Sequence, residues 1–270
     1  MLHFAEQDWD EMPLVEGALA MTAAVEPSFP HEWVRLQLTR LAQEAEHALM
    51  DEPNAQLRLE GLIRLFYREW GFQGDHEQYF SSENIYLDRV LERKKGIPVS
   101  LGAIFLYLAR RLELPVFGVG FPTQFVLKVE WFDAETQYIN PFDGEYLSKR
   151  MMGAWLKGHH GPFTELRDEY FLTSDNTDIL ARWLTVMKSA FLRENQFAEA
   201  LRCSDVALDA FRPGDPHEIR DRGYIYQQLD CSHAAIMDYE YFIEQCPEDP
   251  AAELLKIQVE ELHKAPLVFH

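Results

Sequence analysis

Cysteine and basic residues are scarce in this chain of 270 residues. The three cysteines, Cys203, Cys231 and Cys246, all lie in the last third and form no close pair. An odd number of separated cysteines argues against a disulfide framework and is typical of a reducing compartment. The 25 Lys and Arg residues face 45 Asp and Glu residues, which gives a formal net charge of −20. Because anionic surfaces are bound by concentrated positive charge, we predict no nucleic-acid partner and no membrane partner.

Long apolar segments, targeting signals and cofactor motifs are missing as well. No apolar run approaches the roughly 18 residues of a membrane-spanning helix. The first eleven residues are acidic where a signal peptide needs positive charge, so we expect a soluble cytoplasmic protein. Neither spaced-glycine fingerprint of a phosphate-binding loop occurs. The neighbours His159 and His160 would point apart on a regular element. We therefore predict no cofactor and no metal site.

Apolar residues make up 47% of the chain, and their spacing predicts that the first 96 residues are entirely helical. One apolar stripe lies within residues 31–50, a second lies within residues 59–70, and a third helix is expected after Ser82. Residues 97–109 are apolar on all sides, which is typical of a helix buried on every face. Pro98 suits the first turn of that helix.

Beyond residue 115 the helical period gives way to alternation. Apolar residues occupy every second position in residues 117–121 and 125–131, and residues 136–140 continue the pattern. The short polar stretches between these segments are typical of hairpin turns. The pattern predicts three antiparallel strands with one buried face.

A polar loop from Lys157 to Asp178 is the best candidate for a domain boundary, and it follows a short helix around Met152. We predict a first domain over residues 1–165, which holds the helical region and the strands. A second domain is predicted over residues 175–270.

The second domain repeats itself. The segment Phe211–Pro216 recurs as Gln245–Pro250, 34 residues later. A helical period of 34 residues is the signature of the tetratricopeptide repeat, so we predict two such repeats followed by a capping helix over residues 251–264. A plain helical bundle is the alternative. The residues expected to face inward on the capping helix are Leu254, Leu255 and Val259.

Three motifs between Gly96 and Glu145 identify a family. They are GIPVSL, VGFPTQF and INPFDGE, and in this combination the chain resembles the family founded on the SirB invasion regulator. Members of that family join a transglutaminase-like domain to tetratricopeptide repeats. The resemblance implies an α+β fold that is mostly helical, with a degenerate transglutaminase-like (papain-like) core of helix and antiparallel sheet and a helical module of two repeats.

The resemblance also implies where a catalytic set would lie. Folds of this class place a cysteine at the start of a buried helix, a histidine on the neighbouring strand and Asp or Asn on the next strand. The matching positions hold Ser100, Gln124 and Asn140. Glutamine cannot act as a general base near neutral pH, and a serine without a base is a weak nucleophile. Lys128 lies about 13 Å along the strand from Gln124, too far to help, and Asp143 suits a turn. We interpret the three as relic positions and assign no catalytic residue.

Three hypotheses follow. The first is a non-catalytic regulatory protein that binds a protein or peptide in the groove of its repeats and affects gene expression indirectly, through that partner. The alternative is an acyl-transfer hydrolase, amidase- or protease-like, that uses Ser100. A third is that the relic cleft binds an amide or peptide end without reacting. The residues expected to line the repeat groove are Arg182, Arg193, His217, Arg220, Tyr224 and Gln227.

Overall fold

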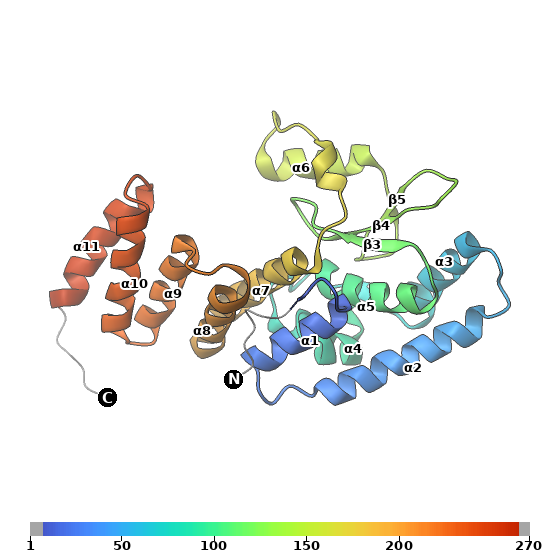
Figure 1. Cartoon of the computed structure of the whole chain (residues 1–270), viewed down its shortest axis with the longest axis horizontal. Helices are drawn as coiled ribbons and strands as arrows, with labels where there is room; N and C mark the ends of the chain where they lie inside the picture. Colours follow the sequence, from blue (N-terminus) through green and yellow to red (C-terminus); the bar gives the residue numbers. More distant parts are fainter. Residues whose placement is uncertain (1–7, 265–270) are drawn as a thin grey trace. The chain divides into compact units, whose positions relative to one another are not determined.

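The computed structural model of the chain describes residues 8–264 (Figure 1). Internal contacts divide these residues into two compact units. We call Asp8–Trp183 the sheet unit and the residues from Leu184 onward the repeat unit. The division falls inside helix α7 (Asn176–Arg193). The limits 1–165 and 175–270 stay a prediction about separate domains, which would be tested by folding each part alone.

The helices of the sheet unit follow the apolar stripes of the sequence. Helix α2 spans His31–Leu49, as the stripe within residues 31–50 predicted. Helix α3 begins after Asn54, whose side chain accepts the backbone N–H groups of residues 56 and 57 at 2.8 and 3.1 Å. Helix α5 begins at Pro98, as predicted, and most of its residues are buried. The full set before the sheet is α1 (Leu14–Val25), α2, α3 (Ala55–Ile63), α4 (Leu87–Arg93) and α5 (Pro98–Arg111).

A π-helical turn over Arg64–Glu69 continues α3. It holds more residues per turn than an α-helix. Three consecutive side chains, Leu65, Phe66 and Tyr67, are buried in it. The Phe66 ring stacks on Phe72 at a centroid distance of 4.2 Å. This turn therefore brings two neighbouring aromatic rings into the core together.

The prediction that residues 1–96 are entirely helical is wrong in one place. Strand β1 (Gln73–Gly74) pairs in parallel with β2 (Lys95–Gly96). The pairing closes the segment that contains α4 and delivers the chain to the start of α5. Strands of two residues are too short to show an alternating pattern, so they could not be predicted from the sequence. Residues 1–7 of the predicted helical region lie outside the described residues.

The main sheet is an antiparallel meander in the order β3-β4-β5-β6. Register pairs Val119 with Val126 and Leu127 with Ile139. The second and third strands lie inside the predicted segments, the first begins one residue before its segment, and the fourth, a strand of two residues, was not predicted. The strands are β3 (Val116–Val119), β4 (Val126–Val129), β5 (Gln137–Ile139) and β6 (Tyr146–Leu147).

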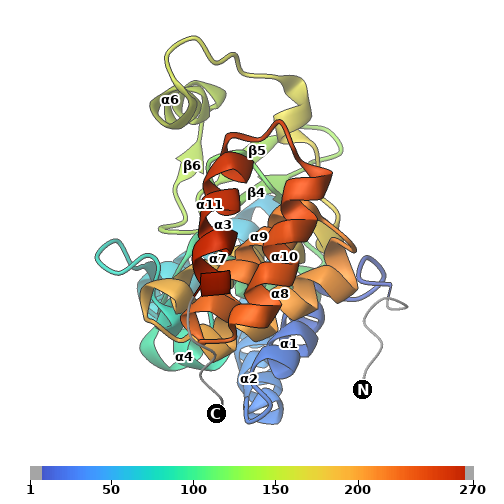
Figure 2. The ribbon, with the colours of Figure 1, turned by 90° about the vertical axis from the view of Figure 1, so that its left-hand side faces the viewer.

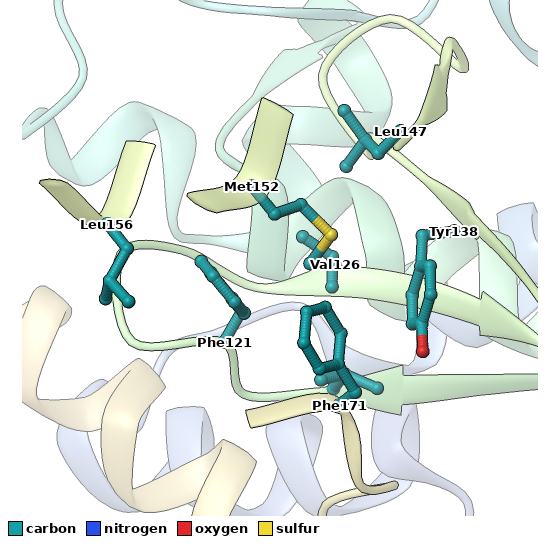
Figure 3. Close-up of a cluster of buried hydrophobic side chains, with 8 residues drawn as sticks. Phe121, Val126, Tyr138, Leu147, Met152, Leu156 and Phe171 are labelled. Atoms are coloured by element: carbon teal, nitrogen blue, oxygen red, sulfur yellow. The ribbon is translucent and has the colours of Figure 1, made fainter. Parts of the chain in front are cut away.

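Different helices cover the two faces of this sheet. Helix α5 packs on one face, and α6 (Lys149–His160) packs on the other. Helix α6 begins after Ser148, whose hydroxyl accepts the N–H of Met151 at 3.2 Å. The apolar cluster under α6 (Figure 3) consists of Val119, Phe121, Val126, Tyr138, Leu147, Met152, Leu156 and Phe171.

The repeat unit is built from helices that pack against their neighbours in sequence order. Contacts join α8 to α9, α9 to α10 and α10 to α11. Figure 1 shows α9, α10 and α11 in a row, and Figure 2 shows α10 and α11 side by side. Asp215 caps α9 by accepting the N–H of Glu218 at 2.8 Å, and Pro216 occupies its first turn. The helices are α8 (Phe197–Val206), continued by a π-helical turn over Ala207–Phe211, then α9 (Pro216–Gln228), α10 (Ser232–Gln245) and α11 (Pro250–Lys264).

The predicted inward face of the capping helix is correct in part. Val259 is buried, and Leu255 packs against the cluster formed by Ala235 and Tyr239. Leu254, in contrast, is 70% exposed, so its predicted inward position is wrong. Adjacent residues point about 100° apart on a helix, and α11 packs on α10 through one face, so one of the two leucines faces solvent.

Candidate functional site

Ser100 lies in the first turn of α5 and is completely buried. Its hydroxyl accepts the backbone N–H of Ile97 at 3.1 Å and donates to the carbonyl of Asn84 at 2.7 Å. The Ile97 carbonyl, 3.1 Å away, is a second acceptor. A hydroxyl can donate one hydrogen bond, and here its acceptor is a peptide carbonyl, which cannot act as a base. Ser100 therefore joins α5 to the segment before α4.

Helix α5 meets the sheet at Gly102. Two residues turn a helix by about 200°, so the positions of Ser100 and Gly102 point to nearly opposite sides. A Cβ atom at Gly102 would overlap the ring of Phe125 and lie 3.6 Å from Pro141 Cβ. The sheet-facing side of the helix start therefore has no room for a nucleophilic side chain.

Gln124 and Asn140 do lie together. The Nε2 of Gln124 donates to the Oδ1 of Asn140 at 3.3 Å, and the Nδ2 of Asn140 donates to Asp143 at 3.0 Å. The other carboxylate oxygen of Asp143 accepts the N–H of Glu145 at 2.9 Å, which fixes the turn. These side chains can position the amide group of a ligand through hydrogen bonds. The amides of Gln124 and Asn140 cannot take up a proton near neutral pH, so neither can act as a general base.

The backbone beside Asn140 is held by buried groups. Tyr67 donates its hydroxyl to the carbonyl of Pro141 at 3.0 Å. Burial, and then the charge of Asp143, raise the pKa of Tyr67 well above its usual range, so the phenol stays a neutral donor. Gly74 donates its N–H to the carbonyl of Phe142 at 2.8 Å, and a Cβ at Gly74 would overlap the Phe142 ring. The INPFDGE motif thus packs as part of the core.

Lys128 lies on the other side of the sheet from α5. It pairs across the strands with Tyr138, whose ring belongs to the cluster under α6. Its ammonium group lies 2.5 Å from the carboxylate of Glu130. Lys128 therefore cannot take the proton of Ser100, in line with the strand spacing.

Arg182, one of the predicted groove residues, lies in the sheet unit. Its guanidinium donates to the carbonyls of Phe121 at 2.6 Å and Pro122 at 3.1 Å. Burial lowers the pKa of Arg182 from its usual range. The side chain fixes the backbone just before Gln124, so its guanidinium is already occupied within its own unit.

Four other predicted groove residues share one face of α9. His217, Arg220, Tyr224 and Gln227 follow one another at steps of three and four residues. His217 and Arg220 both approach the ring of Phe242 on α10, at 5.4 and 5.3 Å. The structure therefore brings these two side chains together over one aromatic ring.

The other members of that face differ in how available their side chains are to a partner. Tyr224 is 48% exposed. Gln227 accepts the hydroxyl proton of Tyr239 at 2.9 Å, which ties α9 to α10. Arg193, the sixth predicted residue, lies in the last turn of α7. Tyr224 is therefore the best-placed contact residue of the set.

A buried ion pair in the repeat unit was not predicted. Lys188 and Glu218 are each 5% exposed and lie 2.5 Å apart. Glu218 also accepts the hydroxyl proton of Ser204 at 2.9 Å, and Asp221 lies 3.4 Å from Lys188. The signal in the sequence was the lysine itself, four residues after Leu184 in an apolar stripe.

A second charged cluster joins three helices of the repeat unit. Arg222 donates to both carboxylate oxygens of Asp238, at 2.8 and 2.9 Å, and lies 3.5 Å from Asp205. The hydrogen bond to Asp238 raises the pKa of Arg222 above its usual range. Such bidentate pairs hold helices in register.

Thiols and metal ligands add no further site. Cys203 is buried, and burial raises the pKa of its thiol, which makes it a poor nucleophile. Within residues 8–264, no group of three or more His, Cys, Asp and Glu side chains is placed to hold a metal ion. The absence of a cofactor stays a prediction. No helix in the same range is long and apolar enough to cross a membrane.

Family comparisons agree with this architecture. The profile of the transglutaminase-like superfamily matches residues 32–185, and that of the tetratricopeptide repeat matches residues 187–260. Fold and site together define a transglutaminase-like protein with a repeat module. The prediction of an α+β, mostly helical fold is confirmed.

Full-length relatives give the family. The chain is 52% identical to a UPF0162 protein of Vibrio cholerae, 42% identical to the UPF0162 protein YchA of Escherichia coli K12 and 40% identical to the protein SirB1 of Salmonella typhimurium. Each match covers 100% of both chains. The chain therefore belongs to the SirB1 and UPF0162 family, which confirms the resemblance. No solved structure matches it.

Proposed function

We propose that this protein is a non-catalytic interaction protein: the sheet unit performs no reaction, and the repeat unit binds a segment of a protein partner. The observation that carries the proposal is the Ser100 hydroxyl, which is completely buried and donates to a peptide carbonyl. A nucleophile must reach its substrate and give its proton to a base. Ser100 meets neither condition.

The neighbouring positions support the same conclusion. Gln124 stands where a histidine would be needed, and its amide is bonded to Asn140. The side of α5 that faces the sheet carries Gly102, packed against Phe125. Neither the sheet nor the helix therefore supplies a base or a nucleophile at this place.

The partner-binding surface is proposed on α9. Tyrosine and arginine are the most frequent anchors of protein interfaces, because each offers a large contact area with a polar end. Tyr224 is half-exposed, and Arg220 and His217 lie over Phe242 one and two turns before it. Two repeats form a short groove, so we expect modest affinity.

Any effect on gene expression would pass through that partner. A formal net charge of −20 opposes binding to DNA phosphates. The resemblance to an invasion-regulator family favours a regulatory role, and a protein partner is the route that the charge allows.

Labelling with a fluorophosphonate probe tests the absence of chemistry. We expect no covalent label on the wild-type protein or on Ser100→Ala, under conditions that label an active serine hydrolase completely. A label on the wild type that disappears in Ser100→Ala would contradict the proposal and restore the hydrolase alternative.

Site-specific photo-crosslinking tests the partner surface. A photoreactive phenylalanine analogue replaces Tyr224, which is 48% exposed, in one variant and Ile257 of α11, which is 58% exposed, in a control. We expect a discrete cross-linked protein in cells from position 224, absent from position 257 and lost when Arg220→Glu is added. The same products from both positions would contradict a specific surface on α9.

A further inference from the structure

Helix α6 is basic in an acidic protein. Its twelve residues, Lys149–His160, include three Lys or Arg and two His and no acidic residue, while the whole chain has a formal net charge of −20. Lys149 lies 4.0 Å from Asp168. Arg150 and Lys157 make no ion pair within the described part of the chain. Two cations of α6 are thus available to an outside partner.

These cations border a groove of about 700 Å³ between α6 and the loop that follows it. The floor is formed by two small residues, Gly153 and Ala154, with Lys149 and Arg150 at one end and Lys157 at the other. Small residues between long cationic ones leave space for a chain to lie along the helix. Positive charge at both ends favours a ligand with two separated negative charges.

The far wall of the groove is largely exposed and carries three apolar residues, Pro162, Phe163 and Leu166. It consists of residues 162–166, and Phe163 in it is 95% exposed. The loop is anchored, because Thr164 donates its hydroxyl to the carbonyl of His160 at 2.9 Å. A fully exposed phenylalanine on an anchored loop gains free energy when a partner covers it.

We infer that this groove is a docking site for a short acidic segment of a partner protein. Arg150 and Lys157, the two cations without an ion pair among the described residues, are seven residues apart, which is about 10.5 Å along a helix. An extended peptide covers about 3.3 Å per residue, so two acidic residues three to four positions apart match the two ends. An apolar residue between them would reach Phe163.

A peptide fits this groove better than a polyanion. Glu165 is the single acidic residue among those that line it. Beyond the groove, the negative charge of the chain repels a long phosphate backbone, whereas a short segment stays within about one Debye length, roughly 8 Å, of the cations. The site lies wholly in the sheet unit, so it is separate from the surface proposed on α9.

Fluorescence anisotropy with the full-length protein tests this docking site. The probe is a fluorescein-labelled peptide of sequence GEAFAEG, and the comparison peptides are GKAFAKG and GEASAEG. We expect micromolar binding of GEAFAEG, no binding of GKAFAKG and about tenfold weaker binding of GEASAEG. Raising the salt from about 50 to 300 mM should weaken binding several-fold.

Charge reversal supplies the matched variants. Arg150→Glu/Lys157→Glu should weaken binding at least about tenfold. Arg40→Glu/Arg68→Glu makes the same charge change at exposed positions elsewhere in the sheet unit and should change affinity less than about twofold. Circular dichroism checks that both double variants fold.

Three results would overturn the inference. One is no binding of GEAFAEG at about 1 mM peptide, where even weak complexes form. Another is equal loss of affinity in both double variants, since the effect would then be one of net charge. The third is that a dT12 oligonucleotide or phosphatidylserine vesicles bind through Arg150 and Lys157 more tightly than the peptide, which would assign the groove to another class of ligand.

Discussion

The start of α5 and the centre of the repeat unit bury polar groups in different ways. The Ser100 hydroxyl is neutral and donates its hydrogen bond to a peptide carbonyl. Lys188 and Glu218 are full charges that depend on each other and on Ser204. A neutral group bonded to the backbone costs little to bury, whereas an ion that loses its partner is left without compensation.

The two units should therefore be destabilised by different kinds of substitution. Around α5 the packing is so close that added volume should be the most damaging change. In the repeat unit, where short helices are joined by ion pairs, loss of one charge should be the most damaging change. Substitutions that change volume, hydrogen bonding or charge one at a time test this difference between the two units.

The largest effect is expected from Lys188→Ala. It leaves the Glu218 carboxylate buried without its cation, which should lower the free energy of unfolding by about 3–5 kcal/mol. Urea unfolding followed by circular dichroism measures the change. As a control, Lys256→Ala removes an exposed pair with Glu253 and should cost less than about 0.5 kcal/mol. Similar losses in both variants would break the comparison.

Gly102→Ala should have the next largest effect. The added methyl group overlaps the ring of Phe125, and overpacking of this kind costs about 1–3 kcal/mol. Gly158→Ala is the matched control within α6, where nothing lies within 4 Å of the new Cβ, and it should stabilise by about 0.5–1 kcal/mol. Thermal unfolding of both variants compares them. Stabilisation by Gly102→Ala would show that α5 can move away from the sheet.

Ser100→Ala should cost somewhat less. Removal of the hydroxyl leaves the Asn84 carbonyl and the Ile97 N–H without this partner, at about 1–2 kcal/mol. Ser189→Ala removes a hydroxyl that bonds only back to its own helix, at the carbonyl of Thr185, and should be close to neutral. If Ser100→Ala left the free energy of unfolding unchanged in the same assay, the structural role assigned to this serine would be wrong.

The smallest effect, of opposite sign, is expected from Asp88→Asn. Burial raises the pKa of Asp88, and one of its carboxylate oxygens has no hydrogen-bond partner among residues 8–264. A raised pKa means that the native state holds the proton more tightly, so this group favours folding below about pH 4 and opposes it once the pH has risen through the native pKa. Asp88→Asn should therefore stabilise the protein at pH 7, by less than about 1 kcal/mol.

The pH profile of that variant supplies the check. Between about pH 4 and pH 7 the wild type should lose stability relative to Asp88→Asn. If the free energies of unfolding of the wild type and of Asp88→Asn changed with pH in parallel, another interaction would be stabilising the buried carboxylate, and the prediction would be contradicted.

Elements with a long regular pattern could be predicted from the sequence. Residues 97–109 are apolar on every side, and the helix they form is buried on every side. Alternation located β3, β4 and β5, and the 34-residue period located the repeats. β1, β2 and β6 were missed because two residues cannot establish a period.

The sequence motifs identified the residues of the candidate site but not the directions in which their side chains point. The motifs marked Ser100, Gln124 and Asn140, but Ser100 turns towards Asn84, a contact sixteen residues away in sequence. No local pattern records such a contact, because it depends on how α4 and α5 pack. The pair of Lys188 and Glu218, thirty residues apart, was hidden for the same reason.

The π-helical turn over Arg64–Glu69 makes this part of the chain intolerant of length changes. One residue deleted from α3, ahead of this turn, would rotate every side chain that follows it on the helix by about 100°. The Tyr67 hydroxyl would then leave the Pro141 carbonyl, and the INPFDGE segment would lose an anchor supplied from seventy-four positions earlier. Substitutions on the solvent face can be absorbed here, whereas a single-codon deletion should disturb a motif in a distant part of the gene.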